Sequence, residues 1–265
     1  MIKVILTLLS IGGSCWAGGC SENLAVTQPK IANANSADAN SIDEILNQLS
    51  QKTSELKSYQ CRIEYRFSQP LFESQTLRKG DLYYQKTGKK TKLRINFQTL
   101  KQDDEKEQKY IEQYIFDGAW LTHIDYQIRQ VKKHQLAESD ELVDVFEFVS
   151  QNFPIIGFTG IDKLKKEFEI ELGEQQGSKG VDFTHLHLKV KPDSIYKADY
   201  TSIEFWINKG FYLPAEIIAV SVEEDIYRIQ LLEPKVNKEI DKGVFDVKVS
   251  EGFGEDIILL KEVHR

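Results

Sequence analysis

The sequence predicts an α+β protein built on an open, unclosed antiparallel β-barrel or strongly curved sheet, with helices covering the concave face. Apolar and polar residues alternate over many segments separated by short turns, and helical periodicity appears in only a few places. Of the 265 residues, 41% are hydrophobic and 11% aromatic, which is enough for a packed core. With no repeat and no Pro- or Ser-rich linker after Asn40, we expect one folded domain over residues 41–265.

The predicted domain begins with an amphipathic helix. Ser41 and Glu44 have the spacing of a capping box, in which each side chain bonds the other residue's backbone N–H. Apolar residues then follow at helical spacing as far as Leu56. We therefore expect a helix from Ser41 to about Lys57.

A period of two replaces the helical period at Tyr59, which predicts a half-buried strand over residues 59–67. Cys61 lies on the apolar side of this strand, so we interpret it as a buried structural thiol. Turn residues such as Gly88 and Gly118 separate the later segments. Further strands are predicted over residues 80–85, 93–97, 110–116, 121–126, 128–132, 181–190, 202–207, 216–222, 226–232 and 245–249.

The helical period returns between residues 138 and 172. An apolar stripe over residues 142–149 ends at Pro154, and a second short helix is predicted over residues 162–168. Helices that interrupt a strand meander lie across the mouth or the concave face of the sheet.

Residues 1–19 are predicted to be a signal peptide. Lys3 precedes an apolar run over residues 4–11 that is shorter than the ~20 residues of a membrane-spanning helix. The small residues before Cys20 resemble a bacterial lipobox, which makes Cys20 the candidate lipid anchor; ordinary cleavage near Gly19 is the alternative. Residues 20–40 contain no aromatic residue and are predicted to be a flexible tether.

Composition and motifs do not favour nucleic-acid binding, metal binding or catalysis. The 34 Lys and Arg against 41 Asp and Glu give a net charge of −7, which does not favour nucleic-acid binding. His185 and His187 have a spacing used by zinc sites, but no third ligand is evident and Lys189 shares their face, so we expect an exposed sheet face and no metal. No nucleophile elbow, phosphate loop or dinucleotide fingerprint occurs, so we expect no enzymatic activity and no cofactor.

Two surface features each have two interpretations. The basic hairpin over residues 86–94 could contact anionic headgroups, although a solvated strand edge is the preferred interpretation. Leu71 and Phe72 follow Pro70 at a loop tip, where they either insert into a membrane or, as we prefer, fold back onto the core.

The many aromatic residues suggest either a large core or an apolar ligand-binding cavity. The 14 Phe, 11 Tyr and 3 Trp fall largely on one face of successive strands, where they form either an ordinary core or a cavity for an acyl chain. Strand alternation alone proposes the following lining residues: Tyr59, Ile63, Tyr65, Phe67, Leu82, Tyr84, Leu93, Ile95 and Phe97.

Three features follow one another in a recognisable order: the Gly80-Asp81-Leu82-Tyr83-Tyr84 segment, the Phe116-Asp117-Gly118 turn, and Asn237, Phe245, Val247 and Gly252 near the end. With the predicted elements over about residues 41–257, this order resembles the periplasmic lipoprotein carrier and outer-membrane receptor family (LolA/LolB-like). It implies an unclosed antiparallel barrel whose helices form a lid over an apolar cavity for acyl chains. Lys86 stands where the carrier has an arginine bonded to the lid, which makes it the lid-coupling candidate, although lysine lacks the planar fork of arginine.

We therefore expect a non-enzymatic lipoprotein of the cell envelope, exported to the periplasm and anchored to the outer membrane by lipid. A monomer of this kind would bind acyl chains or acylated lipoproteins in an apolar cavity, for transport or acceptance at that membrane. One alternative is an envelope-stress sensor or protein-interaction module on the same fold. Another is an envelope hydrolase with an unrecognised site.

Overall fold

One open sheet dominates the structure, a computed structural model that describes residues 36–138, 161–173, 177–178, 181–249 and 251–260. Within these residues, the sheet is accompanied by two α-helices, α2 (Ser36–Ser54) and α4 (Ile161–Glu167), and by two short 3-10 helices, η1 (Pro70–Phe72) and η2 (Lys242–Phe245). The strands are β1 (Ser58–Gln69), β2 (Ser74–Thr87), β3 (Lys90–Gln102), β4 (Gln108–Phe116), β5 (Trp120–Asp125), β6 (Gln130–Gln135), β7 (Phe168–Leu172), β8 (Gly177–Ser178), β9 (Val181–Val190), β10 (Tyr200–Asn208), β11 (Leu213–Ser221), β12 (Ile226–Val236) and β13 (Gly254–Ile258).

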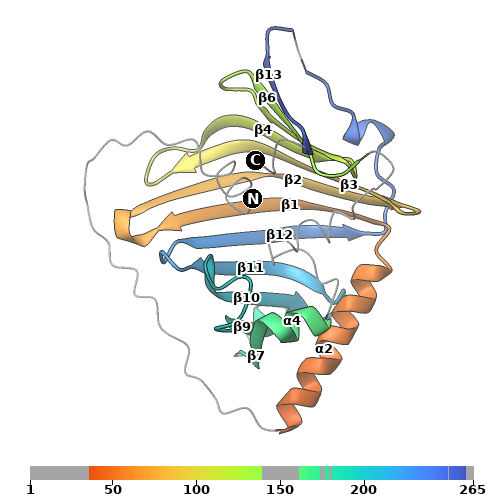
Figure 1. The fold of residues 1–265 in the computed structure, drawn as a ribbon, viewed down its shortest axis with the longest axis vertical. Helices are drawn as coiled ribbons and strands as arrows, with labels where there is room; N and C mark the ends of the chain where they lie inside the picture. Colours follow the sequence, from red (N-terminus) through yellow and green to blue (C-terminus); the bar gives the residue numbers. More distant parts are fainter. Residues whose placement is uncertain (1–35, 139–160, 174–176, 179–180, 250, 261–265) are drawn as a thin grey trace.

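The sheet joins two meanders through the first long strand. Its order is β13-β6-β5-β4-β3-β2-β1-β12-β11-β10-β9-β7, with β8 paired to β9. Neighbouring strands are antiparallel except for β13 and β6, which are parallel. Figure 1 shows β1 and β12 side by side in the middle of the molecule, with β2, β3, β4, β6 and β13 on one side and β11, β10, β9 and β7 on the other. No pairing closes the sheet among the described strands, so the prediction of an open antiparallel sheet is confirmed.

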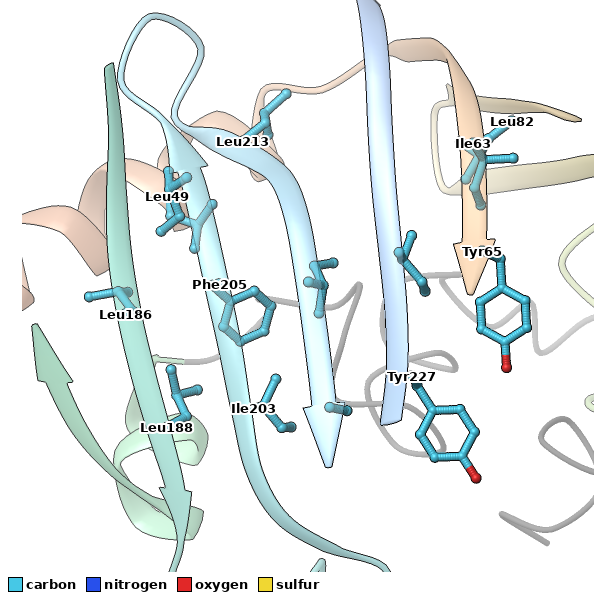
Figure 2. Close-up of a cluster of buried hydrophobic side chains, with 14 of the residues drawn as sticks. Leu49, Ile63, Tyr65, Leu82, Leu186, Leu188, Ile203, Phe205, Leu213 and Tyr227 are labelled. Atoms are coloured by element: carbon cyan, nitrogen blue, oxygen red, sulfur yellow. The ribbon is translucent and has the colours of Figure 1, made fainter. Parts of the chain in front are cut away.

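The register places one set of side chains on the same face of all the long strands. Tyr65 of β1 lies opposite Ile229 of β12, which lies opposite Ile217 of β11 and then, on β10, Phe205. These residues belong to one buried cluster, part of which Figure 2 shows. We call the face that carries this cluster the inner face and the opposite one the outer face.

The helices cover part of the inner face. Leu46 and Leu49 of α2 and Leu164 of α4 belong to the buried cluster. The main contacts of α2 are with β7, β11 and α4, and those of α4 are with β7 and α2, so among the described residues the helices pack chiefly against the β7–β11 part of the sheet. The sequence predicted that helices cover the concave face; within the described residues the helices pack only against this part of the sheet, so the predicted cover is not shown.

Several boundaries differ from the expectations. The helix α2 begins at Ser36, so Ser41 lies inside it and is not its N-cap. The short helix predicted over residues 162–168 is present as α4, but residues 168–172 form strand β7 where the sequence suggested helical periodicity. The strand predicted over residues 245–249 is wrong: η2 ends at Phe245, and the last strand is β13. The helix predicted over residues 142–149 lies outside the described residues.

No helix among the described residues is long and apolar enough to cross a bilayer.

A candidate ligand-binding face

The structure brings the nine predicted lining residues together on the inner face of β1, β2 and β3. In the registers of these strands, Ile63 lies opposite Gly80, Leu82 opposite Ile95, and Tyr84 opposite both Tyr59 and Leu93. Seven of the nine are buried and belong to the main cluster, while Leu93 and Ile95 are half-buried and pack against it. We call these nine residues the apolar strip: Tyr59, Ile63, Tyr65, Phe67, Leu82, Tyr84, Leu93, Ile95 and Phe97.

Aromatic contacts extend the apolar strip across neighbouring strands. Phe97 contacts Tyr65 and Tyr114, each with ring centroids 6.3 Å apart, and Tyr114 stacks on His123 at 4.5 Å. On the other side, Phe67 stacks on Tyr227 at 5.0 Å. Tyr65 and Tyr227 project from the same side of β1 and β12 (Figure 2). The inner face is therefore aromatic from β5 to β12.

A charged cluster interrupts this aromatic surface near the η1 end of β1. Arg78 lies opposite Tyr65, and Glu112 lies opposite Phe97, so both side chains are on the inner face. Arg78 Nε lies 3.4 Å from Glu112 Oε2, and the two side chains are 3% and 2% exposed. A buried charge is costly unless it is paired, so this pair needs its local partners.

Glu112 is held mainly through one of its oxygens. Tyr114 donates a 2.8 Å hydrogen bond to Glu112 Oε1, and His123 Nε2 lies 2.8 Å from the same atom. Within the part of the chain that the structure describes, Glu112 Oε2 and Arg78 Nε are buried without any hydrogen bond. The ion pair is thus close but incompletely satisfied.

Two hydroxyl groups in the same region are also unsatisfied. Thr76 lies opposite Phe67, next to Arg78 along the inner face of β2, and its Oγ1 is buried without a hydrogen-bond partner among the described residues. The hydroxyl of Tyr200 is likewise buried and unpaired, and its ring contacts Tyr227 with centroids 6.5 Å apart. We call the whole set the polar patch: Thr76, Arg78, Glu112, Tyr114, His123 and Tyr200.

The tyrosines of this region stay protonated. Burial is the largest cause that raises the pKa of Tyr65, and Arg78 lowers it while Tyr227, Tyr200 and Glu112 raise it. Burial likewise raises the pKa of Tyr114 and Tyr200. The charges of the polar patch therefore act on Tyr65, and the hydroxyls remain hydrogen-bond donors.

Sequence reasoning missed the polar patch. Arg78, Glu112 and His123 come from three strands that only the pairing register brings together. The one signal in the sequence was an arginine on the apolar side of an alternating segment, two residues before Gly80. His123 hydrogen-bonds Glu112, and the described residues place no serine, threonine or cysteine side chain in hydrogen-bond contact with its ring. The side chains of the polar patch thus present hydrogen-bond donors and acceptors on the inner face.

The remaining candidates lie away from this face or outside the described residues. Lys86 is half-buried near the end of β2, where its backbone N–H bonds the carbonyl of Lys57, and its role in lid coupling stays a prediction. Cys20, the predicted lipid anchor, lies outside the described residues. Cys61 is a free, buried cysteine, and burial raises the pKa of its thiol to about 12, which fits the predicted structural role.

The basic hairpin is only partly free. Lys89 and Lys90 are exposed, whereas the Lys92 ammonium lies 5.6 Å from the ring centre of Phe245. Arg94 donates hydrogen bonds to the carbonyls of residues 244 and 246 and to Gln113. The base of the hairpin therefore holds the segment around η2.

Leu71 and Phe72 do not fold back onto the core. They are 71% and 73% exposed on η1, so the preferred expectation for this loop tip is wrong. The loop ends at Glu73, whose left-handed backbone turns the chain into β2.

On the outer face, His185 and His187 share a partner, Glu204, which the spacing of the two histidines does not indicate. Glu204 of β10 lies 2.6 Å from His185 Nε2 and 2.5 Å from His187 Nδ1. His185 also stacks on Trp206 at 4.2 Å. Among the described residues, no group of three or more His, Cys, Asp or Glu side chains is arranged to hold a metal ion.

No protein-family model matches the chain, and no curated protein matches it. Among solved structures, it is similar to an uncharacterized conserved protein from Thermus thermophilus, with a TM-score of 0.49 and 10% identity over 82% of this chain and 99% of that one. It is also similar to Pseudomonas aeruginosa MucB in its MucA/MucB complex, with a TM-score of 0.47 and 10% identity over 78% of this chain and 61% of that one.

A LolA superfamily protein from Nitrosomonas europaea is similar with a TM-score of 0.33 and 13% identity, over 77% of this chain and 97% of that one. The chain spans less than two thirds of the MucB chain. With TM-scores below 0.5, these similarities carry no assignment of family or function, so any function has to be argued from the chain's own residues.

Proposed function

We propose that this protein is a non-enzymatic, monomeric lipoprotein of the cell envelope that binds acyl chains, or the acyl chains of lipoproteins, on its inner face. The predicted signal peptide and the lipid anchor at Cys20 would place it in the periplasm on the outer membrane. The observation that carries the proposal is the apolar strip, which extends over three neighbouring strands and continues into the aromatic residues beside them.

The physical basis is the burial of hydrocarbon. Covering an acyl chain is worth ~0.8 kcal/mol for each methylene that leaves water, so a strip of this length could hold a chain firmly. The apolar strip is largely buried in the structure, so an acyl chain would reach it after an opening motion.

The first test is direct. Protein purified from membranes is extracted with organic solvent, and the extract is analysed by mass spectrometry for bound lipid. Binding is then measured by fluorescence titration with a fluorescent fatty acid. We expect saturable binding at one site; absence of both recovered lipid and saturable binding would contradict the proposal.

A pair of variants locates the site. Ile95 is half-buried on the inner face, and Ile218 is half-buried on the outer face of another strand. Ile95→Ser should weaken acyl-chain binding about tenfold because apolar contact is lost. Ile218→Ser removes the same atoms from the other face and should leave the affinity within about twofold. Equal effects of the two substitutions would place the site elsewhere.

The exposed tip favours the second candidate function, a protein-interaction module. Leu71 and Phe72 project from η1, and the nearby turn over residues 222–225 carries three acidic residues. A partner surface with an apolar pocket and a basic rim would complement this tip. Replacing both apolar residues by Ser should change the free energy of unfolding by less than about 0.5 kcal/mol. Loss of a stoichiometric protein partner in that variant, with acyl-chain binding unchanged, would support this function.

A further inference from the structure

The inner face is itself amphiphilic. Along β1 and β2, the residues from Ile63 and Leu82 to Tyr59 and Tyr84 are mostly apolar, whereas the end next to η1 carries the polar patch. Arg78 and Tyr84 are six residues apart on one strand, about 20 Å along the sheet. A ligand that lay along this face would meet hydrocarbon at one end and charge at the other.

The polar-patch atoms that lack a hydrogen bond indicate what kind of chemical group would complement them. Arg78 Nε, Thr76 Oγ1 and Tyr200 Oη can each donate a hydrogen bond, and Glu112 Oε2 can only accept one while it is ionised. Three donors and one acceptor would complement a group with several acceptor oxygens and one donor. Arg78 and Glu112 have opposite charges. A bound group that complements both would therefore carry a negative part next to Arg78 and a positive part next to Glu112.

We propose that the polar patch binds the zwitterionic headgroup of a phospholipid that combines a phosphate with a primary ammonium group. The phosphate oxygens accept hydrogen bonds from Arg78, Tyr200 and Thr76, and the ammonium group donates to Glu112. The acyl chain then lies along the apolar strip. This inference rests on the proposed function, which it makes specific for one class of lipid.

Electrostatics favours this headgroup over a simple anion. Glu112 already balances the charge of Arg78, so a ligand with only negative charge would be repelled by Glu112 as it approached. Asp125, which accepts a hydrogen bond from Tyr110, lies opposite Glu112 on β5 and adds to this repulsion. A zwitterion introduces no net charge into the buried site.

The test compares headgroups on a constant chain. Lysophosphatidylethanolamine, lysophosphatidylcholine and lysophosphatidylglycerol with the same acyl chain are titrated below their micelle concentrations against a bound fluorescent fatty acid. We expect lysophosphatidylethanolamine to bind about tenfold more tightly than lysophosphatidylcholine, which has no N–H donor for Glu112. Lysophosphatidylglycerol, which has no positive charge, should bind most weakly.

A double variant removes the charges without leaving one of them alone. Arg78→Gln with Glu112→Gln keeps both positions polar and avoids an unpaired buried charge. In this variant the three lysolipids should bind with affinities within about threefold of one another. The control is Arg228→Gln with Glu216→Gln, which removes a hydrogen-bonded Arg–Glu pair from the outer face of β12 and β11 and should preserve the preference.

A single, milder substitution tests the headgroup contact even if the double variant does not fold. Tyr200→Phe removes an unsatisfied hydroxyl from the buried core, so the free protein should be equally or more stable. If the hydroxyl bonds the phosphate, affinity for lysophosphatidylethanolamine falls severalfold in the same variant.

The outcomes separate this inference from the proposed function. If the fluorescent fatty acid and all the lysolipids bind equally well to the unmodified protein, the headgroup inference is wrong and the acyl-chain function stands. The same holds if Tyr200→Phe leaves the affinity for lysophosphatidylethanolamine unchanged and the double variant keeps the headgroup preference. If neither the fatty acid nor any lysolipid binds, the proposed function fails and the inference fails with it.

Discussion

Glu204 joins two histidines into one charged unit on the outer face. Burial by itself raises the pKa of this carboxyl, but the hydrogen bonds with His185 and His187 outweigh it and bring the pKa down to about 2. The hydrogen bond with Glu204 is in turn the largest cause that raises the pKa of His187, against burial and Lys189. Because each shift favours the charged form, the unit stabilises the fold when both groups are ionised.

The shifts predict how Glu204→Gln changes stability with pH. A lowered carboxyl pKa stabilises the protein above its ordinary value of 4.5 and loses that effect as the pH falls towards about 2. A raised histidine pKa stabilises the protein below 6.5 and loses that effect as the pH rises through the raised value. The substitution should therefore cost most, about 2 kcal/mol, between pH 4.5 and 6.5.

Urea unfolding of both proteins across this pH range measures the difference. Glu169→Gln is the control, because Glu169 is an exposed carboxylate on the neighbouring part of the sheet. A cost for Glu204→Gln that stays constant with pH would show that the pair acts without ionisation of the histidine.

The same site shows what the sequence could and could not predict at the scale of residues. The alternation around His185 and His187 correctly placed both side chains on one face of a strand. Their partner Glu204 is on the next strand, and only the pairing of Glu204 with His187 brings it close. The same holds for Arg78 and Glu112 on the inner face: they come from different strands, and the separation of cross-strand neighbours in the sequence is not fixed.

At the scale of elements, Gly80 controls how closely β2 and β3 approach. A Cβ atom at this position would lie 1.9 Å from the backbone oxygen of Asn96 and 2.8 Å from the Cα of Phe97. The register of the two strands shifts next to this glycine, between Lys79 and Gly80. No side-chain rotation can relieve a clash with backbone atoms, so the strands would have to separate.

Gly80→Ala should therefore lower the free energy of unfolding by about 3 kcal/mol or more. Because Gly80 lies between Leu82 and Arg78, the substitution should also disturb acyl-chain binding. Chemical denaturation followed by circular dichroism measures the first effect. Gly243→Ala is the matched control, since a Cβ there would meet its nearest neighbour, an Asp246 carboxylate oxygen, at 3.9 Å. A small loss for Gly80→Ala, comparable to this control, would contradict the backbone argument.

The long strands with strong alternation were predicted well, whereas the short strand β7 and the exposed strand β13 were missed. Alternation identified most of the long strands, and the strand over residues 181–190 has the predicted bounds. β7 was missed because it is short and directly follows a helical segment: Phe168, Ile170 and Leu172 alternate with two glutamates, but five residues were counted with the helical region before them, and pairing with β9 holds them as a strand. β13 is mostly exposed and is held by parallel pairing with β6, so its sequence shows no buried face.

At the scale of the whole molecule, the pairing of β1 with β12 makes one sheet from two meanders. Tyr59 lies opposite Val236, and Phe67 lies opposite Tyr227, so these contacts join opposite ends of the described chain. Asn237 strengthens the junction because its side chain accepts hydrogen bonds from the backbone N–H groups of Lys57 and Ser58. The sequence predicted an open sheet but not its strand order, since long-range pairing leaves no local signal. The junction also makes the inner face continuous from Arg78 on β2 to Tyr227 on β12 and Tyr200 on β10.

The last prediction concerns how the whole protein is placed in the cell. If Cys20 carries the lipid, Cys20→Ala should convert a membrane-associated protein into a soluble periplasmic one, because stable anchoring depends on the acyl chains attached there. Acyl-chain affinity should not change, since the apolar strip is built from β1, β2 and β3. Fractionation, mass spectrometry of the mature N-terminus and the fluorescence titration measure the three properties.

Cys15→Ala is the matched control, because Cys15 lies within the predicted signal peptide and should be absent from the mature chain. A mature chain that begins at an unmodified Cys20 would exclude the lipid anchor and favour ordinary cleavage near Gly19, whereas a Cys20→Ala variant that stays with the membrane would show that another segment holds it there. Acyl-chain binding to the inner face would survive either result, because anchoring and binding depend on different parts of the chain. A loss of binding in Cys20→Ala would instead mean that the attached lipid itself occupies the apolar strip.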